Sequence, residues 1–432
     1  MADLHELAGR ARGAFYELSV SPLEKRNQVL SALAERLRAR QEEIFRANEE
    51  DLRLAEEEQL AAPLLHRLRF GKEKLAQVTA GLLSLRELPD PLRRTTMATE
   101  ITPGLALYRV TCPIGVIGVI FESRPDALIQ IASLCVKSGN SVLLKGGREA
   151  LRTNRLLAAC VREALAACGF PEDGAILLET REDVAEMLKE DTLIDLIIPR
   201  GSNAFVRYIM DHSRIPVLGH SDGICHVYLD EDAKAEIAIP VAVDSKTQNL
   251  AVCNAMETLL VHEKAAARLL PALAEKLREK GVELRGDARV REIVDCLPAT
   301  EEDWDTEYLD AILSIRVVDS LGEAIEHINR HGSHHTDCIV TENAEHAAAF
   351  LDRVDSAGVY WNVSTRFADG YVYGLGAEVG IATGKLHARG PMGLEGLTTY
   401  KYKLLGSGQT MPAMKRGEAE YTHHFLEQEC PV

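Results

Sequence analysis

The sequence predicts an α/β protein with doubly wound parallel sheets, divided into more than one domain. Three observations support this prediction. The chain has 432 residues, which exceeds what one hydrophobic core usually supports. Strand-like and helix-like segments then alternate in two separate series, one from Gly115 and one after Cys225. Parallel strands need helical crossovers, so this alternation favours parallel sheets covered by helices.

The first ninety or so residues should be helical. Ser21, Pro22 and Glu24 offer an N-cap, a first-turn proline and a capping-box glutamate before an amphipathic pattern. Residues 95–110 then change character, with threonines and alternating apolar residues around Pro103-Gly104. This pattern predicts a β-hairpin.

The two α/β series are read from short apolar runs. The first contains the expected strands VIGVIF, SVLLK, AILL and LIDLIIP, with helices expected over residues 126–138 and 149–168. The second contains HVYLD, METLLV, SIRVV, CIVT and GVYWN, with helices expected over residues 263–280 and 321–330. Continuous apolar runs are typical of strands buried on both faces.

The C-terminal part departs from this alternation. The glycine-rich segment 367–391 should be an ordered loop region that lines a site. LTTYKYKLLG is typical of an extended strand. The charged tail after Gly406 is expected to be mobile.

Composition excludes several classes of function. The net charge of −17 opposes binding to nucleic acid or to anionic membranes. No stretch approaches the ~20 apolar residues of a membrane helix, and the N-terminus lacks a signal-peptide core, so a cytoplasmic protein is expected. Nine cysteines without a CxxC pair predict neither disulfides nor a zinc site. The pairs His334-His335 and His423-His424 lack a third ligand at metal-site spacing, so no metal is expected.

Two turns could bind phosphate groups, although no GxGxxG fingerprint is present. Lys145-Gly146-Gly147 and Arg200-Gly201-Ser202 each follow a strand and precede a helix. Main-chain N–H groups and cations at such a turn can face an anion. Glycine is equally common in ordinary tight turns between a strand and a helix, and both interpretations remain open for each turn.

Cys253 is the candidate nucleophile. It lies in NLAVCN, where a loop enters the strand METLLV. A thiol attacks as the thiolate, which needs exposure and a positive local field, and Lys246 is near in sequence. A buried, inert cysteine is the common alternative, and the residues alone leave both open.

Three further segments combine polar residues with cations: FESRP at 121–125, STRF at 364–367 and HARGP at 387–391. Surface loops can share this composition by chance. Three such loops in an acidic chain favour a pocket that collects a multiply charged anion, because arginine makes bidentate contacts to carboxylate or phosphate.

At these same residues the sequence resembles the gamma-glutamyl phosphate reductases, a family of proline-biosynthesis enzymes with the aldehyde dehydrogenase fold. The resemblance covers nearly the whole chain. Its segments are PIGVIGVIFESRP, SGNSVLLKGGREA, LIIPRGS, CNAMETLLV, STRFADG and GLGAEVGIATGKLHARGPMGLEGLTTYK.

The resemblance implies three structural units. Residues 1–94 and 113–226 would form the NADPH-binding domain, and residues 227–392 the catalytic domain. Residues 95–112 and 393–415 would form a β-flap that joins subunits in relatives, so a homo-oligomer is expected. The implied cofactor is NADPH and the implied substrate is L-glutamyl 5-phosphate.

The chemistry implied by the resemblance runs through a thioester on Cys253. The thiolate displaces phosphate, hydride from NADPH reduces the thioester, and L-glutamate 5-semialdehyde is released. The Cys253 main-chain N–H and the Asn254 amide are the expected oxyanion donors. Oxidising aldehyde dehydrogenases carry a Glu-Leu-Gly-Gly segment whose glutamate acts as a base. By the resemblance, Leu218-Gly219-His220-Ser221 replaces it here, which suits a reductase.

The resemblance also assigns binding residues. Those expected to face the cofactor are Lys145, Gly146, Gly147, Arg200, Gly201 and Ser202. Those expected to hold the substrate carboxylate and phosphate are Arg124, Ser364, Thr365, Arg366, His387 and Arg389. Two departures stand out: Arg124 takes the place of an asparagine of the oxidising enzymes, and Asn249-Leu250 replaces a Pro-containing dipeptide.

Two other functions remain as alternatives. One is another acylating aldehyde dehydrogenase-like oxidoreductase with a different substrate; the missing base and the HARGPMGLEG block count against it. The other is a catalytically silent assembly partner of glutamate kinase, against which the presence of Cys253 counts.

Overall fold

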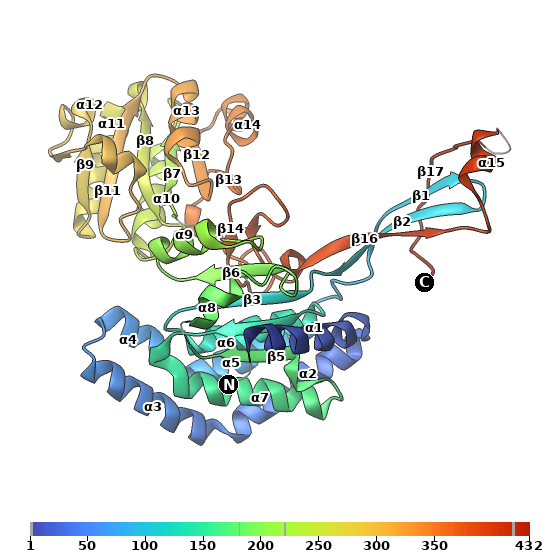
Figure 1. The fold of residues 1–432 in the computed structure, drawn as a ribbon. Helices are drawn as coiled ribbons and strands as arrows, with labels where there is room; N and C mark the ends of the chain where they lie inside the picture. The colour runs from blue at the N-terminus through green and yellow to red at the C-terminus, as the bar shows by residue number, and fades with distance from the viewer. Residues whose placement is uncertain (1–2, 181, 220–221, 417–419) are drawn as a thin grey trace.

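A computed structural model describes residues 3–180, 182–219, 222–416 and 420–432. It contains two parallel sheets, an antiparallel flap and one small two-stranded sheet. Figure 1 shows the parallel sheets in two separate α/β halves, with the flap projecting away from both. Among the residues described, no helix combines the length and apolar character needed to cross a membrane.

The first half is built on a four-stranded parallel sheet of order β5-β4-β3-β6. Alternate residues of β3 point to opposite faces, as a strand requires. Ile117 and Val119 join the core under α2, α5, α6 and α7, whereas Val116 and Ile120 join the core under α1, α8 and α9. The sheet is therefore covered on both faces, as predicted.

The strands of this half are β3 (Val116–Phe121), β4 (Ser141–Lys145), β5 (Ala175–Leu178) and β6 (Leu196–Arg200). Its helices are α1 (Leu4–Val20), α2 (Leu23–Ala39), α3 (Gln41–Glu57), α4 (Ala62–Leu68), α5 (Lys72–Glu87), α6 (Pro125–Lys137), α7 (Leu151–Ala167), α8 (Glu182–Met187) and α9 (Asn203–His212).

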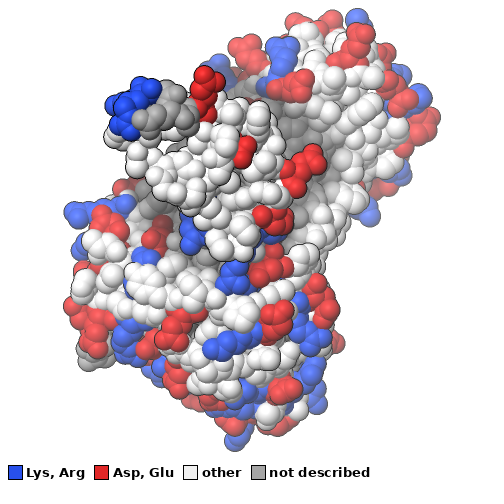
Figure 2. Space-filling view, turned by 90° about the vertical axis from the view of Figure 1, so that its right-hand side faces the viewer, with Lys and Arg blue, Asp and Glu red and all other residues white. Residues whose placement is uncertain are grey.

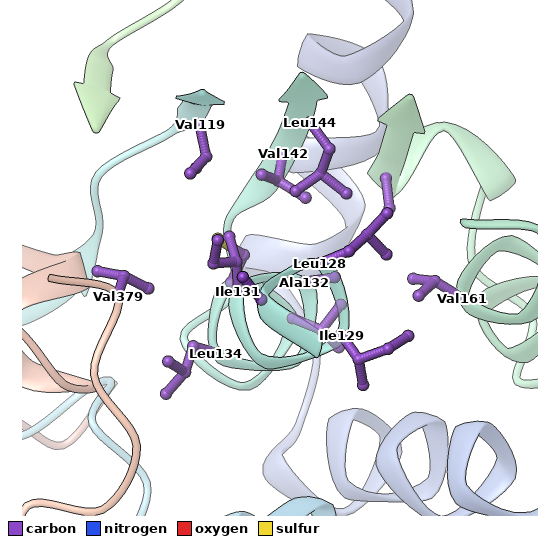
Figure 3. Packing of buried hydrophobic residues seen from close by; sticks show 14 of the residues in the cluster. Val119, Leu128, Ile129, Ile131, Ala132, Leu134, Val142, Leu144, Val161 and Val379 are labelled. Carbon is purple, nitrogen blue, oxygen red and sulfur yellow. The ribbon is translucent and has the colours of Figure 1, made fainter. Parts of the chain in front are cut away.

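Helix α6 forms the centre of this core. Nearly all of its residues are buried, because it lies between the sheet and the outer helices. Figure 3 shows Leu128 and Ile131 of α6 near Val142 of β4. Val379, from the glycine-rich segment, packs against the same cluster. The predicted helix over residues 126–138 thus becomes the central packing element.

The second half is a seven-stranded parallel sheet of order β10-β9-β11-β8-β7-β12-β13. Helices α10 and α11 cover one face, and α13 and α14 cover the other. The five strands predicted in this half are present. Strands β9 and β10 were not predicted, because the four residues ELRG of β9 contain no apolar run and β10 has only two residues.

The strands of this half are β7 (Cys225–Leu229), β8 (Met256–His262), β9 (Glu283–Gly286), β10 (Leu297–Pro298), β11 (Ile312–Val318), β12 (Thr336–Val340) and β13 (Gly358–Trp361). Its helices are α10 (Ala235–Thr247), α11 (Glu263–Glu279), α12 (Ala288–Arg291), α13 (Leu321–His331) and α14 (Ala344–Arg353).

The flap is an antiparallel sheet of order β16-β2-β1-β17. The predicted hairpin forms β1 (Thr95–Thr102) and β2 (Leu105–Pro113), and LTTYKYKLLG forms β16 (Thr398–Leu405). The tail was expected to be mobile. Instead, β17 (His424–Phe425) pairs with β1, and Leu426 and Cys430 pack on the flap core, which needs apolar cover. A short helix, α15 (Met411–Lys415), precedes β17.

The glycine-rich segment returns to the first half of the molecule. Val379, Met392, Leu394 and Leu397 are buried in the core of the four-stranded sheet, although they follow the seven-stranded sheet in sequence. Strands β14 (Ile381–Ala382) and β15 (Gly390–Pro391) pair within it. The segment is ordered, as predicted, and ties the end of the chain to its beginning.

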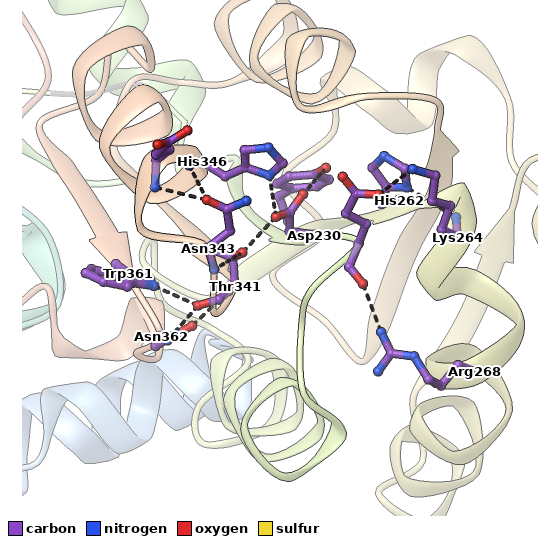
Figure 4. Close-up of polar contacts among 12 residues, drawn as sticks. Asp230, His262, Lys264, Arg268, Thr341, Asn343, His346, Trp361 and Asn362 are labelled. Atoms are coloured by element: carbon purple, nitrogen blue, oxygen red, sulfur yellow. Dashed lines mark hydrogen bonds and ion pairs between the residues drawn. The ribbon is translucent and has the colours of Figure 1, made fainter.

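A buried carboxylate organises the carboxyl edge of the seven-stranded sheet. Asp230, fully buried after β7, accepts hydrogen bonds from the hydroxyls of Tyr228 (2.9 Å) and Thr341 (2.7 Å). The His346 ring of α14 donates to the same carboxylate at 2.8 Å. Figure 4 shows these groups converging from β7, the end of β12 and α14. The carboxylate therefore joins α14 to the sheet.

Asp230→Asn should destabilise the protein by about 1–3 kcal/mol, because an amide cannot accept all three donors. Burial alone would raise the pKa of Asp230, but its hydrogen bonds from Thr341, His346 and Tyr228 outweigh burial and lower it. A depressed carboxyl pKa stabilises the fold above the unfolded pKa, and that stability is lost as pH falls through the folded pKa. Urea midpoints at pH 7 should therefore differ more than midpoints below pH 3.

The matched control is Glu342→Gln, which removes a surface partner of Lys234 at the same edge of the sheet. Exposed ion pairs contribute little, so its urea midpoint should stay near that of the wild type. Equal midpoints for Asp230→Asn and the wild type at pH 7 would show that the buried network contributes no net stability.

Candidate active site

A cleft of about 1860 Å³ lies between the two halves. Its walls are the loops after β3 and β6, the loop before β8, residues 366–381 and the α4–α5 region. The cleft thus lies between the carboxyl edge of the four-stranded sheet and the amino edge of the seven-stranded sheet. A pocket of ~300–1,000 Å³ holds a drug-sized molecule, so this cleft has room for more than one ligand.

Cys253 lines this cleft from the loop 248–255, which joins α10 to β8. A side chain at Gly223 would place its Cβ 2.2 Å from the Cys253 carbonyl oxygen, so only glycine permits this close approach. The Cys225 thiol donates to the same carbonyl at 3.2 Å. The start of β7 therefore fixes the main chain of the loop.

The thiol of Cys253 faces a histidine. His335 Nε2, at the start of β12, lies 3.2 Å from Cys253 Sγ, and only 1% of His335 is exposed. Its Nδ1 lies 2.9 Å from the hydroxyl of Thr336. A proton on Nδ1 is thus held by the hydroxyl oxygen, which leaves the Nε2 lone pair for the thiol. The arrangement suits a base that takes the thiol proton.

Such a base is needed because the thiol resists ionisation. Burial, together with the carboxylates of Glu307 and Glu378, raises the pKa of Cys253 to about 12, against smaller lowering effects of the Cys253 amide and Arg200. The thiol is therefore protonated near pH 7. Glu378 shares this environment: burial raises its own pKa to about 7.

Lys246, the cation nearest to Cys253 in sequence, does not act on the thiol. It is fully buried and pairs with the equally buried Glu257. Lys246 lies in the last turn of α10 and Glu257 lies in β8, so the pair joins the two ends of the Cys253 loop. Positive charge near the thiol comes instead from Arg200 and Arg366. Burial lowers the pKa of both arginines, and the Cys253 thiolate opposes this effect only in part.

Asn254 has a different environment from the one expected of an oxyanion donor. Its Nδ2 donates to the Ala368 carbonyl at 2.9 Å, and its main-chain carbonyl accepts from Thr365 at 2.7 Å. The Asn254 side chain thus ties the loop to residues 365–368. The Cys253 main-chain N–H, the other predicted donor, makes no main-chain hydrogen bond to a described residue and lies against its own thiol.

The predicted cofactor residues fall into two groups. Arg200, Gly201 and Ser202, at the end of β6 and the start of α9, line the cleft. Lys145, Gly146 and Gly147 end β4 at the same sheet edge but lie outside the cleft lining. A Cβ at Gly146 would meet Asn154, and one at Gly147 would meet Glu149, so close packing accounts for both glycines.

The predicted substrate residues fall into three groups. Arg124 and Arg366 line the cleft. Ser364 and Thr365 are buried behind it, where both hydrogen-bond to Ser245. His387 and Arg389 do not line the cleft. They line a separate pocket of about 450 Å³.

Their bonds explain these positions. Arg389 binds Asp355 through both terminal nitrogens, and His387 Nε2 lies 3.0 Å from the Gly396 carbonyl oxygen. The HARGP loop therefore anchors the glycine-rich segment, and the structure does not bring its two cations to Cys253.

Sequence reasoning missed several residues of the site. His335 was considered only as a metal ligand, and Glu378 and Glu307 were not considered. Four cations from the α4–α5 region, Arg67, Arg69, Lys72 and Lys74, also line the cleft. The available signal was a histidine directly before β12, which lies two strands from the β8 strand that follows Cys253, but strand order is not visible in sequence. Within the described ranges, no three metal-ligating side chains cluster.

The segment that replaces a hydrolytic base can be followed only in part. Leu218 and Gly219 line the cleft and carry no basic group. His220 and Ser221 lie outside the residues that the structure describes.

A family model, a sequence relative and a solved structure all place the chain among similar proteins. Residues 1–290 match the model of the aldehyde dehydrogenase family. The gamma-glutamyl phosphate reductase of Pelotomaculum thermopropionicum is 59% identical over 406 residues, covering 94% of each chain. The crystal structure of gamma-glutamyl phosphate reductase from Thermotoga maritima is 40% identical with a TM-score of 0.93, covering 95% of this chain and 100% of that one.

A more distant solved structure shares the fold alone. An engineered glycolyl-CoA reductase with bound NADP+ has a TM-score of 0.65 at 16% identity, covering 94% of this chain and 97% of that one.

Proposed function

This chain belongs to the aldehyde dehydrogenase family and, within it, to the gamma-glutamyl phosphate reductases, and from that membership we propose its reaction. It reduces L-glutamyl 5-phosphate with NADPH to L-glutamate 5-semialdehyde and phosphate, in L-proline biosynthesis. The observation that carries this proposal is the Cys253–His335 contact in a cleft lined by arginines. A thiol paired with a base argues against the alternative of a catalytically silent assembly partner, which would need neither group.

The chain's own residues account for the acyl-transfer step. His335 Nε2 takes the proton of Cys253, and the thiolate attacks the acyl carbon. The Cys253 main-chain N–H stabilises the oxyanion, and phosphate leaves. A thioester remains on Cys253. After reduction, the collapsing thiohemiacetal returns the thiolate, which recovers its proton from His335.

A nicotinamide cofactor supplies the hydride that the thioester accepts. The donor set at the carboxyl edge of the four-stranded sheet fits such an anionic group, because α9 starts there without a side-chain cap and Lys145 lies at the same edge. We propose that residues 1–94 and 113–226 form the NADPH-binding domain and that residues 227–392 form the catalytic domain, with Val379 and Met392 of the latter packed on the core of the former. A lower KM for NADP than for NAD would support the choice of NADPH.

The test runs the reaction backward. Purified protein is mixed with glutamate 5-semialdehyde, NADP and inorganic phosphate, and NADPH absorbance is followed. Product formation should require phosphate, and arsenate should replace it. Turnover that is independent of phosphate would contradict the proposal and favour an aldehyde dehydrogenase that hydrolyses its thioester.

The flap is the surface through which we propose that subunits associate. Edge strand β16 exposes Tyr400, Tyr402 and Leu404 by 53%, 56% and 55%. Figure 2 looks onto the flap. Charged side chains of both signs cover the half built on the four-stranded sheet, whereas the flap presents mostly uncharged side chains. Exposed apolar side chains of this kind favour association. Free thiols at all nine cysteines suit the cytoplasmic location that we also propose.

Tyr400→Glu combined with Leu404→Glu should convert the oligomer to monomer, because two charges would be buried in the contact. Light scattering after gel filtration measures the mass. Tyr16→Glu, which changes an equally exposed aromatic residue on α1, should leave the mass unchanged. A wild-type protein that is monomeric alone and associates only with glutamate kinase would exclude the homo-oligomer.

A further inference from the structure

Arg200 is a half-buried residue whose positive charge has no partner among the described residues. Its Nη1 is inaccessible to solvent and forms no hydrogen bond. Two other arginines, Arg26 and Arg389, also have a buried nitrogen without a partner, but they pair with Asp90 and Asp355 through their remaining nitrogens. Across residues 3–180, 182–219, 222–416 and 420–432, no ion pair is formed by Arg200.

A buried guanidinium without a counterion is costly. Burial and the charge of Arg124 lower the pKa of Arg200, against smaller raising effects of Glu378, Asp126 and the Cys253 thiolate. Glu378 does not compensate the charge fully, because its own pKa is raised to about 7 and its carboxylate accepts from the Gly370 N–H. The site therefore favours an additional anion.

The other two arginines near the thiol are already engaged. Arg124 pairs with Asp126 at 3.3 Å, and Asp126 also lies 3.7 Å from Lys74. Arg366 Nε donates to Gln248 at 2.9 Å. Of these three arginines, Arg200 is the one whose side chain forms no hydrogen bond or ion pair with a described residue, and it lines the same cleft as Cys253.

We propose that the Arg200 side chain binds the phosphate group of the acyl phosphate beside Cys253, with Arg124 as a second cation. This inference rests on the proposed function and deepens it. The main chain of Arg200 belongs to the turn expected to face the cofactor, whereas the side chain of Arg200 binds the substrate. A planar guanidinium suits a phosphate because it can donate two parallel hydrogen bonds.

The position has a consequence for catalysis in each direction. In reduction, Arg200 holds the leaving phosphate next to the acyl carbon that Cys253 attacks. In the reverse reaction, it holds inorganic phosphate next to the thioester. Arg200 therefore favours phosphate over water as the acceptor of the acyl group. This preference needs no general base from the chain.

The experiment varies inorganic phosphate in the reverse reaction catalysed by the full-length protein. Arg200→Met and Arg200→Lys should raise the KM for phosphate by roughly 10- to 100-fold, because a charge-assisted bond to phosphate is lost or loses its bidentate geometry. The KM for NADP should change less than about twofold if the turn's main chain, unaltered in both variants, binds the cofactor.

Arg207→Met is the matched control. Arg207 lies on α9, outside the cleft, where it pairs with Asp222. Its phosphate KM should match that of the wild type. Thermal unfolding of each variant verifies that the fold is kept, and Arg200→Lys keeps the test decisive if Arg200→Met fails to fold.

Each result has a distinct meaning. An unchanged phosphate KM in both folded Arg200 variants, with a phosphate-dependent wild type, would overturn the inference and leave the proposed function standing. A KM for NADP that rises as much as that for phosphate would assign the side chain to the cofactor instead. A wild type that needs no phosphate would overturn the proposed function as well.

Discussion

Cys253→Ala should lower the rate of phosphate-dependent NADP reduction by at least about 10⁴-fold, because the covalent intermediate then has no atom on which to form. The rate is measured with glutamate 5-semialdehyde at saturating phosphate. Mass spectrometry of enzyme quenched during turnover should detect an acyl adduct on the wild-type peptide containing Cys253 and none on the variant.

Cys296→Ala is the control, since Cys296 lies against the core of the seven-stranded sheet, outside the cleft. Its rate should equal that of the wild type. A Cys253→Ala variant that retained most of its activity would rule out the thioester route, whatever the substrate proves to be.

The second large effect is expected for His335→Ala, which should lower kcat by roughly 10²- to 10⁴-fold at pH 7, the usual contribution of a general base. The raised pKa of Cys253, about 12, leaves almost no thiolate at neutral pH without this base. Thiolate then forms only as pH rises, so kcat/KM of the variant should increase about tenfold per pH unit up to that pKa. The wild type should lack this steep alkaline rise.

His334→Asn provides a matched control from the same loop. His334 has a positive φ of 59°, which asparagine tolerates, and its Nδ1 lies 2.6 Å from the Asp355 carbonyl oxygen, not at the thiol. Its pH profile should follow that of the wild type. A flat profile for His335→Ala would mean that another group deprotonates Cys253.

The fold was largely predictable because its main strands are local signals. Runs such as VIGVIF and METLLV are buried on both faces, so their apolar composition is visible without knowledge of their neighbours. Strand order was not predictable, because it depends on crossovers that the pattern does not encode. The order of the seven-stranded sheet places β12 beside β7, with β7 beside β8.

That order explains what was missed in the site. Cys253 and His335 are 82 positions apart and meet because both precede strands whose amino ends share one edge of the sheet. Ligands of parallel sheets usually gather at carboxyl edges, which directed attention to the turns after β4 and β6. The proposed nucleophile, Cys253, lies instead at the amino edge of its own sheet.

The arginine-rich loops show the opposite failure. FESRP, STRF and HARGP have similar composition, yet only Arg124 and Arg366 among their cations line the cleft. Arg389 is neutralised by Asp355, a residue 34 positions earlier in the chain. Composition reports that a cation is present, but not whether a carboxylate from elsewhere already holds it.

The return of the glycine-rich segment to the first core has a consequence for synthesis of the protein. All four strands of the first sheet precede Gly201, but Val379, Met392, Leu394 and Leu397 complete its hydrophobic core. While the chain is still on the ribosome, the first half must expose the apolar surface that these residues later cover. Its folding is therefore completed only after the second half has been translated, and the two halves mature together.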